Sequence, residues 1–123
     1  MNPSLRNYYL NQLYIKRNQL STANDELNKV NAAINSLKNA RDSLRTVYTS
    51  TQNISSSMIQ IFDKATGSVA ATSIRSMTED IDEAKRIIGD DITKATQKKN
   101  EISSRITNLN SQIRNLQWQV NRT

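Results

Sequence analysis

A hydrophobic residue recurs at every seventh position through the second half of the chain, and this repeat limits the folds available to it. The members are Ile74, Ile81, Ile88, Ala95, Ile102, Leu109 and Leu116. A seven-residue apolar repeat places its members on one face of an α-helix, whereas a half-buried strand needs alternation with a period of two. The repeat therefore predicts one long amphipathic helix with a narrow apolar face.

A second set of apolar residues accompanies this repeat, and its register shifts once. Met77 and Ala84 follow Ile74 and Ile81 by three residues, but Ile92 follows Ile88 by four. The later members are Ile92, Lys99, Ile106, Ile113 and Val120. The shift predicts a stutter beside Gly89, where a coiled coil would unwind locally.

The first half of the chain carries a similar apolar stripe. Asn2 can cap a helix, and Pro3 suits the first helical position because an N–H there would have no partner. The stripe continues at spacings of three, four or their sums through Leu10, Leu13, Leu20, Leu27, Val30, Ile34, Leu37, Leu44, Val47, Ile54, Met58, Ile61 and Ala65. It predicts a helix over residues 3–65, with polar interruptions at Arg17, Asn24, Arg41 and Thr51.

The segment between the stripes is the expected bend. The run ATGSVA places Ala65 and Gly67 there, which predicts a bend over 66–70, with Gly67 in a left-handed conformation, and a second helix over 70–121. Ser76 and Glu79 match a capping box that would support the start of that helix, and early acidic residues favour its dipole. So short a connection predicts antiparallel pairing of the two helices. With the bend near Gly67, residues whose numbers sum to about 134 should face each other. Arg41 would then lie near Asp90 and Asp91.

We therefore expect an all-α fold: a single domain, 1–123, that forms a long antiparallel two-helix hairpin resembling a coiled coil. Only 5% of the residues are aromatic, which is too few for a thick globular core. Narrow seams between long helices require fewer apolar residues, which suits a hairpin. We expect a helical bundle to be completed only when a partner joins.

Catalysis and metal binding have little support in the residue types. The chain has no Cys and no His, so the commonest metal ligands and the commonest general base are missing. Adjacent acidic residues such as Asp90 and Asp91 point about 100° apart on a helix and do not readily share a ligand. We expect no enzymatic activity, no cofactor and no metal site.

The charge distribution does not specify a nucleic-acid partner or a membrane. Residues 92–123 carry six basic groups against Glu101 alone, but no aromatic residues alternate with them to stack on bases. The apolar stripes are too narrow and too polar for stable membrane insertion. The first residues lack the apolar core of a signal peptide, so we expect a cytoplasmic protein, and any secretion would not use a cleaved signal.

Apolar residues outside the two stripes predict a surface for another helical protein. The predicted interface residues are Tyr14, Ile15, Tyr48, Ile59, Phe62, Val69, Ile87 and Trp118. A thin hairpin has no thick core to absorb them, which favours helix-on-helix docking. A homodimer is also compatible with this surface.

The bend ATGSVA and the C-terminal segment KKNEISSRITNLNSQIRNLQW, residues 98–118, resemble a known family. They are similar to the WXG-type small helical hairpins of type VII secretion, and most of all to the YwqH-like proteins encoded beside LXG toxins. Ala65 stands where that family has the Trp of Trp-x-Gly, and neither Tyr14 nor Tyr48 begins a Tyr-x3-Asp/Glu export signal.

The resemblance implies a non-catalytic adaptor, or targeting partner, that binds the helical N-terminal domain of a secreted LXG-type effector. A second small helical protein could join that complex. The complex of this chain with the effector, rather than this chain alone, would supply the export signal. The alternative is a self-assembling structural coiled-coil protein of the phage or cytoskeletal type.

Overall fold

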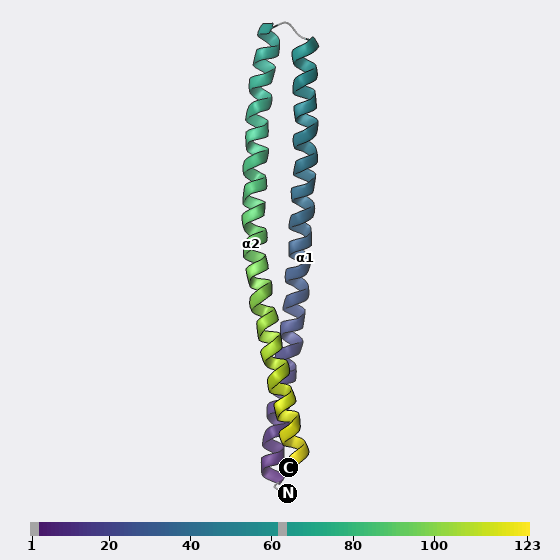
Figure 1. Cartoon of the computed structure of the whole chain (residues 1–123), viewed down its shortest axis with the longest axis vertical. Coiled ribbons are helices and arrows are strands. Elements are labelled where there is room, and N and C mark those ends of the chain that lie inside the picture. The colour runs from purple at the N-terminus through teal and green to yellow at the C-terminus, as the bar shows by residue number, and fades with distance from the viewer. Residues whose placement is uncertain (1–2, 62–63) are drawn as a thin grey trace. The chain divides into compact units, whose positions relative to one another are not determined.

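The structure, a computed structural model, consists of two helices and contains no strand in the residues that it describes, 3–61 and 64–123. Helix α1 spans Pro3–Ile61 and helix α2 spans Lys64–Arg122 (Figure 1). The side chains of residues 58–71 lie outside the described part. Contacts such as Glu26–Arg105 and Tyr48–Lys85 join early residues of one helix to late residues of the other. The predicted all-α antiparallel hairpin is therefore confirmed.

The predicted position of the bend is wrong. Helix α2 begins at Lys64, so Ala65, Gly67 and the remainder of 66–70 are helical rather than a bend. A single interior glycine costs a helix only about 1 kcal/mol relative to alanine. Neighbouring alanines and the absence of proline let the helix continue through it. Helix α2 likewise runs through Gly89 without a positive φ.

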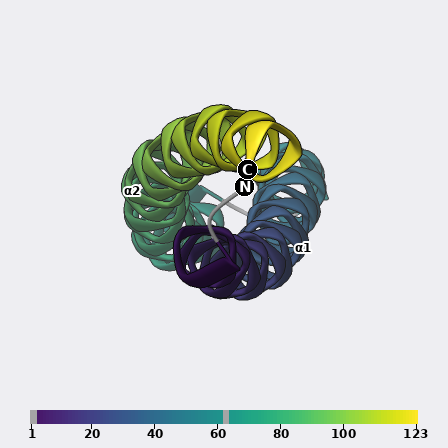
Figure 2. The same cartoon turned by 90° about the horizontal axis from the view of Figure 1, so that it is seen from below.

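The contacts between the helices gather into two compact units. Unit 1 consists of Met1–Ala33 and Ala95–Thr123, and unit 2 consists of Ile34–Lys94. Each unit pairs a stretch of α1 with an antiparallel stretch of α2. The start of α1 and the end of α2 therefore lie at the same end of unit 1 (Figure 2).

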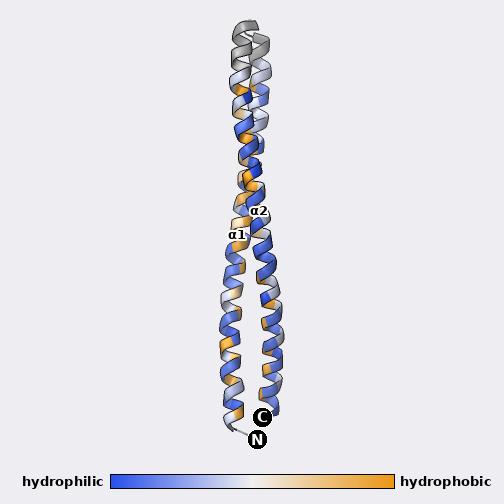
Figure 3. Cartoon of the chain, turned by 90° about the vertical axis from the view of Figure 1, so that its left-hand side faces the viewer, coloured by the Kyte–Doolittle hydropathy of each residue, from blue (hydrophilic) through white to orange (hydrophobic). Residues whose placement is uncertain are grey.

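The helices meet along a seam, which is the line of buried and half-buried residues where α1 faces α2. Seam residues alternate at spacings of three and four, which are positions a and d of a heptad lettered a to g. Figure 3 shows the consequence: hydrophobic residues recur at intervals among hydrophilic ones along both helices. In unit 1 the buried centre is Ala23, Ile102 and Leu109, packed against Leu20, Leu27, Val30 and Ile106.

The seam of unit 2 differs from the expected one in helix α2. Thr78 is only 6% exposed, whereas Met77 is 54% exposed. Lys85 is half-buried, so the seam runs through Ile74, Thr78, Ile81, Lys85, Ile88 and Ile92 without a shift. The predicted stutter beside Gly89 is therefore wrong. Thr78 can be buried at small cost because its hydroxyl donates to the Arg75 carbonyl at 2.8 Å.

In unit 2, helix α1 likewise buries a threonine in the seam and exposes apolar residues. Thr51 is buried, and its hydroxyl donates to the Val47 carbonyl at 2.8 Å. Val47 and Ile54, which the sequence placed in the seam, are exposed. A threonine that bonds to its own helix brings no unsatisfied hydroxyl into the interface.

Arg41 is the least satisfied seam residue among those described. It is half-buried, and its Nε atom is buried without a hydrogen-bond partner. Arg41 was expected near Asp90 and Asp91, and among the described residues it forms no ion pair with either of them; Asp90 accepts a hydrogen bond from Arg86 on its own helix. A buried donor without an acceptor costs about 1–3 kcal/mol.

Replacing Ile102 tests the packing of unit 1. Ile102 is fully buried, at 0% exposure. Ile102→Ala should lower the free energy of unfolding by about 2–5 kcal/mol, since the lost contacts leave a cavity. Thermal and urea unfolding followed by circular dichroism would measure this. The exposed Asn108→Ala is the control, expected to stay within about 0.5 kcal/mol of wild type; equal effects of the two variants would contradict the packing described.

Replacing Arg41 tests the seam of unit 2. Arg41→Leu should raise the free energy of unfolding by about 1–3 kcal/mol, because it removes the unsatisfied Nε and supplies an apolar seam residue. Arg45→Leu is the matched control, since Arg45 is exposed and pairs only with the exposed Asp42. Its effect should be below about 1 kcal/mol. Urea midpoints of the two variants give the comparison, and a destabilised Arg41→Leu protein would refute the expectation.

Candidate functional surfaces

Two contacts between the helices of unit 1 identify the two sides of the seam. Arg105 Nη1 lies 3.0 Å from Glu26 Oε2, and both residues occupy position g of their heptads. Arg17 Nη2 donates to Gln117 Oε1 at 3.0 Å, and both of these residues occupy position e. We call the side with g positions the g flank and the side with e positions the e flank.

Unit 1 exposes most of its aromatic side chains. Tyr14 is 66% exposed, and Tyr8 and Trp118 are also more than half exposed. The Tyr8 and Tyr9 rings meet edge to face at 5.5 Å. The Arg122 guanidinium lies 4.4 Å from the centre of the Trp118 ring, which shields one face of the indole.

The predicted residues of unit 1 do not form one continuous patch. Tyr14 and Ile15 are both exposed, but as neighbours on a helix they point about 100° apart. Ile15 follows Tyr8 by seven residues and therefore lies on the same face of α1 as Tyr8. Unit 1 thus presents apolar side chains on more than one side.

Two open hollows lie along unit 1, and both are lined largely by polar side chains. One is lined by Tyr8, Tyr9, Gln12, Lys16, Gln112, Asn115 and Leu116. The other is lined by Asn18, Gln19, Thr22, Arg105 and Leu109. Neither lining contains a carboxylate.

The net charge of the chain resides in unit 1. Its residues include nine Lys and Arg against three Asp and Glu, whereas unit 2 has eight of each. The excess of six positive charges in unit 1 matches the net charge of +6 for the whole chain. Unit 1 therefore attracts acidic surfaces, and unit 2 exerts little net long-range force.

The predicted interface residues of unit 2 are placed in two different ways. Ile87 is exposed. Tyr48 is half-buried in the seam, and Lys85 Nζ lies 4.7 Å from the centre of its ring, so Tyr48 packs within the chain. The side chains of Ile59, Phe62 and Val69, which were also predicted interface residues, lie outside the described part of the chain.

Three exposed apolar residues of unit 2 were not predicted as surface residues. Val47, Ile54 and Met77 were expected in the seam, but they are exposed at position g. The heptad of Leu13 and Leu20, carried forward in sevens, reaches Tyr48 and Ser55. That continuation would have placed Val47 and Ile54 one residue outside the seam.

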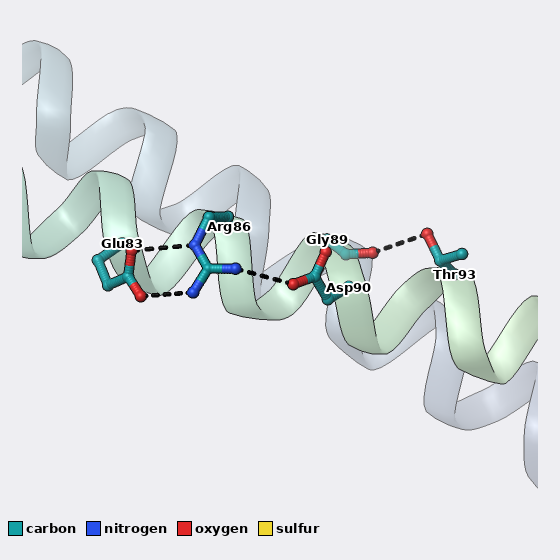
Figure 4. A network of polar contacts seen from close by, with 5 residues as sticks. All are labelled: Glu83, Arg86, Gly89, Asp90 and Thr93. Carbon is teal, nitrogen blue, oxygen red and sulfur yellow. Dashed lines mark hydrogen bonds and ion pairs between the residues drawn. The ribbon is translucent and has the colours of Figure 1, made fainter.

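The acidic segment of α2 forms ion pairs along the helix surface. Arg86 donates to both carboxylate oxygens of Glu83 and to Asp90 Oδ2, and the Thr93 hydroxyl donates to the Gly89 carbonyl (Figure 4). The predicted capping box is wrong, because α2 begins at Lys64 and Ser76 lies inside the helix.

Three carboxylates of this segment, those of Asp82, Glu83 and Asp90, face basic side chains of the same helix. Besides the Arg86 contacts, Lys85 Nζ lies 3.4 Å from Asp82 Oδ1. Within the described residues, no three potential metal ligands come together. The segment therefore offers ion pairs that follow the helix rather than a convergent site.

The Arg86 contacts alter the ionisation of their partners. The hydrogen bonds from Arg86, and then its charge, lower the pKa of Glu83. Glu83 in turn raises the pKa of Arg86, with a smaller contribution from Asp90. A lowered carboxyl pKa means that the pair stabilises the helix above the pKa of an unfolded glutamate. That contribution is lost as the pH falls through the lowered pKa.

The pKa of Glu83 is directly measurable. Arg86→Gln should raise it toward 4.5, the value of a glutamate without partners. A pH titration of the Glu83 carboxyl carbon by NMR would detect the change. Arg75→Gln removes another exposed arginine of α2 and should leave the titration unchanged. Identical Glu83 titrations in wild type and Arg86→Gln would show that the pair does not persist in solution.

Comparisons of the chain with family models, with curated proteins and with solved structures found no match in any of the three. In the part of the chain that the structure describes, no helix has a stretch apolar enough to span a bilayer.

Proposed function

We propose that the chain is a non-catalytic helical adaptor that binds another helical protein through exposed aromatic and apolar side chains. The observation that carries this proposal is the exposure of Tyr8, Tyr14 and Trp118 in unit 1. Large aromatic side chains supply much of the binding energy at protein interfaces. A pair of helices has no further layer of its own to cover them.

The resemblance to WXG-type and YwqH-like hairpins suggests the class of partner. It would be the helical N-terminal domain of an LXG-type effector of type VII secretion, which this chain would stabilise and help to present for export. The excess positive charge of unit 1 favours a partner with an acidic surface, because opposite charges speed association. Ile15 would extend the contact within unit 1, and the exposed Ile87 offers a separate apolar contact in unit 2.

Co-expression with the helical proteins encoded beside this chain tests the proposal. A complex that persists in size-exclusion chromatography is the expected result. Absence of any complex, together with filaments formed by the chain alone in electron micrographs, would favour the structural coiled-coil alternative.

Two substitutions test the aromatic contacts within such a complex. Tyr14→Ala and Trp118→Ala should each weaken binding about tenfold or more, as truncation of a buried aromatic anchor does. Calorimetry with the purified partner would measure the affinities. Ser21→Ala and Ser111→Ala are matched controls, since each exposed serine lies one heptad away from its aromatic counterpart. Unchanged affinity in both aromatic variants would remove unit 1 from the interface.

A further inference from the structure

The g flank of unit 2 is apolar at five of the six positions whose side chains the structure describes. Its residues are Ala40, Val47 and Ile54 from α1 and Met77, Ala84 and Asp91 from α2. Val47, Ile54 and Met77 are exposed large hydrophobic residues. The e flank of unit 2 instead carries Lys38, Arg45, Gln52, Arg75, Asp82 and Gly89.

The α1 and α2 parts of this g flank lie on the same side of the seam. In unit 1 the ion pair between Glu26 and Arg105 joins the g positions of the two helices. Val47 and Ile54 follow Glu26 by whole heptads, and Met77 precedes Arg105 by whole heptads. The same pairing of g positions therefore brings Val47, Ile54 and Met77 onto one face of unit 2.

Apolar residues at a, d and g are typical of helices that face the core of a larger bundle. A two-stranded coiled coil needs apolar residues only at a and d and usually carries charges at e and g. On the g flank of unit 1, α1 carries Gln12, Gln19 and Glu26 between Leu5 and Ala33, so the middle of that flank follows the two-stranded pattern. Unit 2 follows the bundle pattern, with a face that its own two helices do not cover.

We propose that a second copy of this chain covers this face, so that two copies of unit 2 form a four-helix bundle. In a two-fold symmetric dimer the same patch meets itself, so a charged patch would meet its own charge. Here the α1 side is bordered by the exposed and uncharged Ser36, Ser43, Ser50 and Ser57. On and beside the α2 side, Asp80 and Asp91 are accompanied by Lys94. Unit 2 has as many basic as acidic residues, whereas two copies of unit 1 would repel each other.

The face is large enough for a stable dimer. Residues 34–57 of α1 extend about 36 Å at 1.5 Å per residue, and two helices side by side are about 20 Å wide. Each copy thus offers about 700 Å², or about 1,400 Å² for the pair. Stable interfaces bury about 1,200–2,000 Å² in total.

Sedimentation equilibrium of the purified full-length chain tests this proposal. The wild type should have twice the 14.0 kDa mass of one chain and dissociate on dilution. Val47→Lys/Ile54→Lys should raise the dissociation constant about a hundredfold or more, because both copies lose apolar contacts and gain facing charges. Thr46→Lys/Asn53→Lys adds the same charge to exposed positions one residue earlier and should remain dimeric.

A second pair of variants tests the α2 side of the face. It keeps the proposal testable if the first pair fails to fold. Met77→Lys should weaken the dimer, whereas the neighbouring exposed Ser76→Lys should not. Circular dichroism would verify that each variant stays helical. A wild type that is monomeric at all concentrations would overturn the proposal and leave the face to a different helical partner. A dimer insensitive to both Val47→Lys/Ile54→Lys and Met77→Lys would also overturn it. Because no partner is added, either result leaves the proposed adaptor function to its own test.

Discussion

Two helices that pair with each other share only one face, so each can bury little more than its a and d positions. In unit 1 this face is well filled, since Ala23, Ile102 and Leu109 are buried among other apolar residues. All other heptad positions face water or another molecule. The exposure of the aromatic residues, the placement of the ion pairs and the contrast between the flanks all follow from this restriction.

The seam of unit 2 shows how polar residues can occupy such a narrow interface. Thr51 and Thr78 satisfy their hydroxyls with carbonyls of their own helices, so they can be buried without a partner across the seam. The buried Nε atom of Arg41, in contrast, has no hydrogen-bond acceptor.

The two units have different surface chemistry, and the two proposals assign them different tasks. Unit 1 carries the net positive charge and the exposed aromatic residues, which favour a heterologous partner. Unit 2 has balanced charges and an apolar g flank, which favour a second copy. A homodimeric adaptor of this kind would offer two partner-binding surfaces in one particle, which would raise its apparent affinity for a multivalent target.

The sequence by itself determined the helical class, the start of the first helix at Pro3 and most of the seam of unit 1. Long apolar repeats with almost no turn residues permit little else. It did not locate the turn, because small residues such as those around Gly67 are compatible with both a bend and a helix. In α1 the heptad of Leu13 and Leu20 excludes Val47 from the seam, but in α2 steps of three and four from Ile74 reach both Met77 and Thr78. Both spacings are compatible with an apolar stripe, and only the facing helix decides which of the two residues is buried.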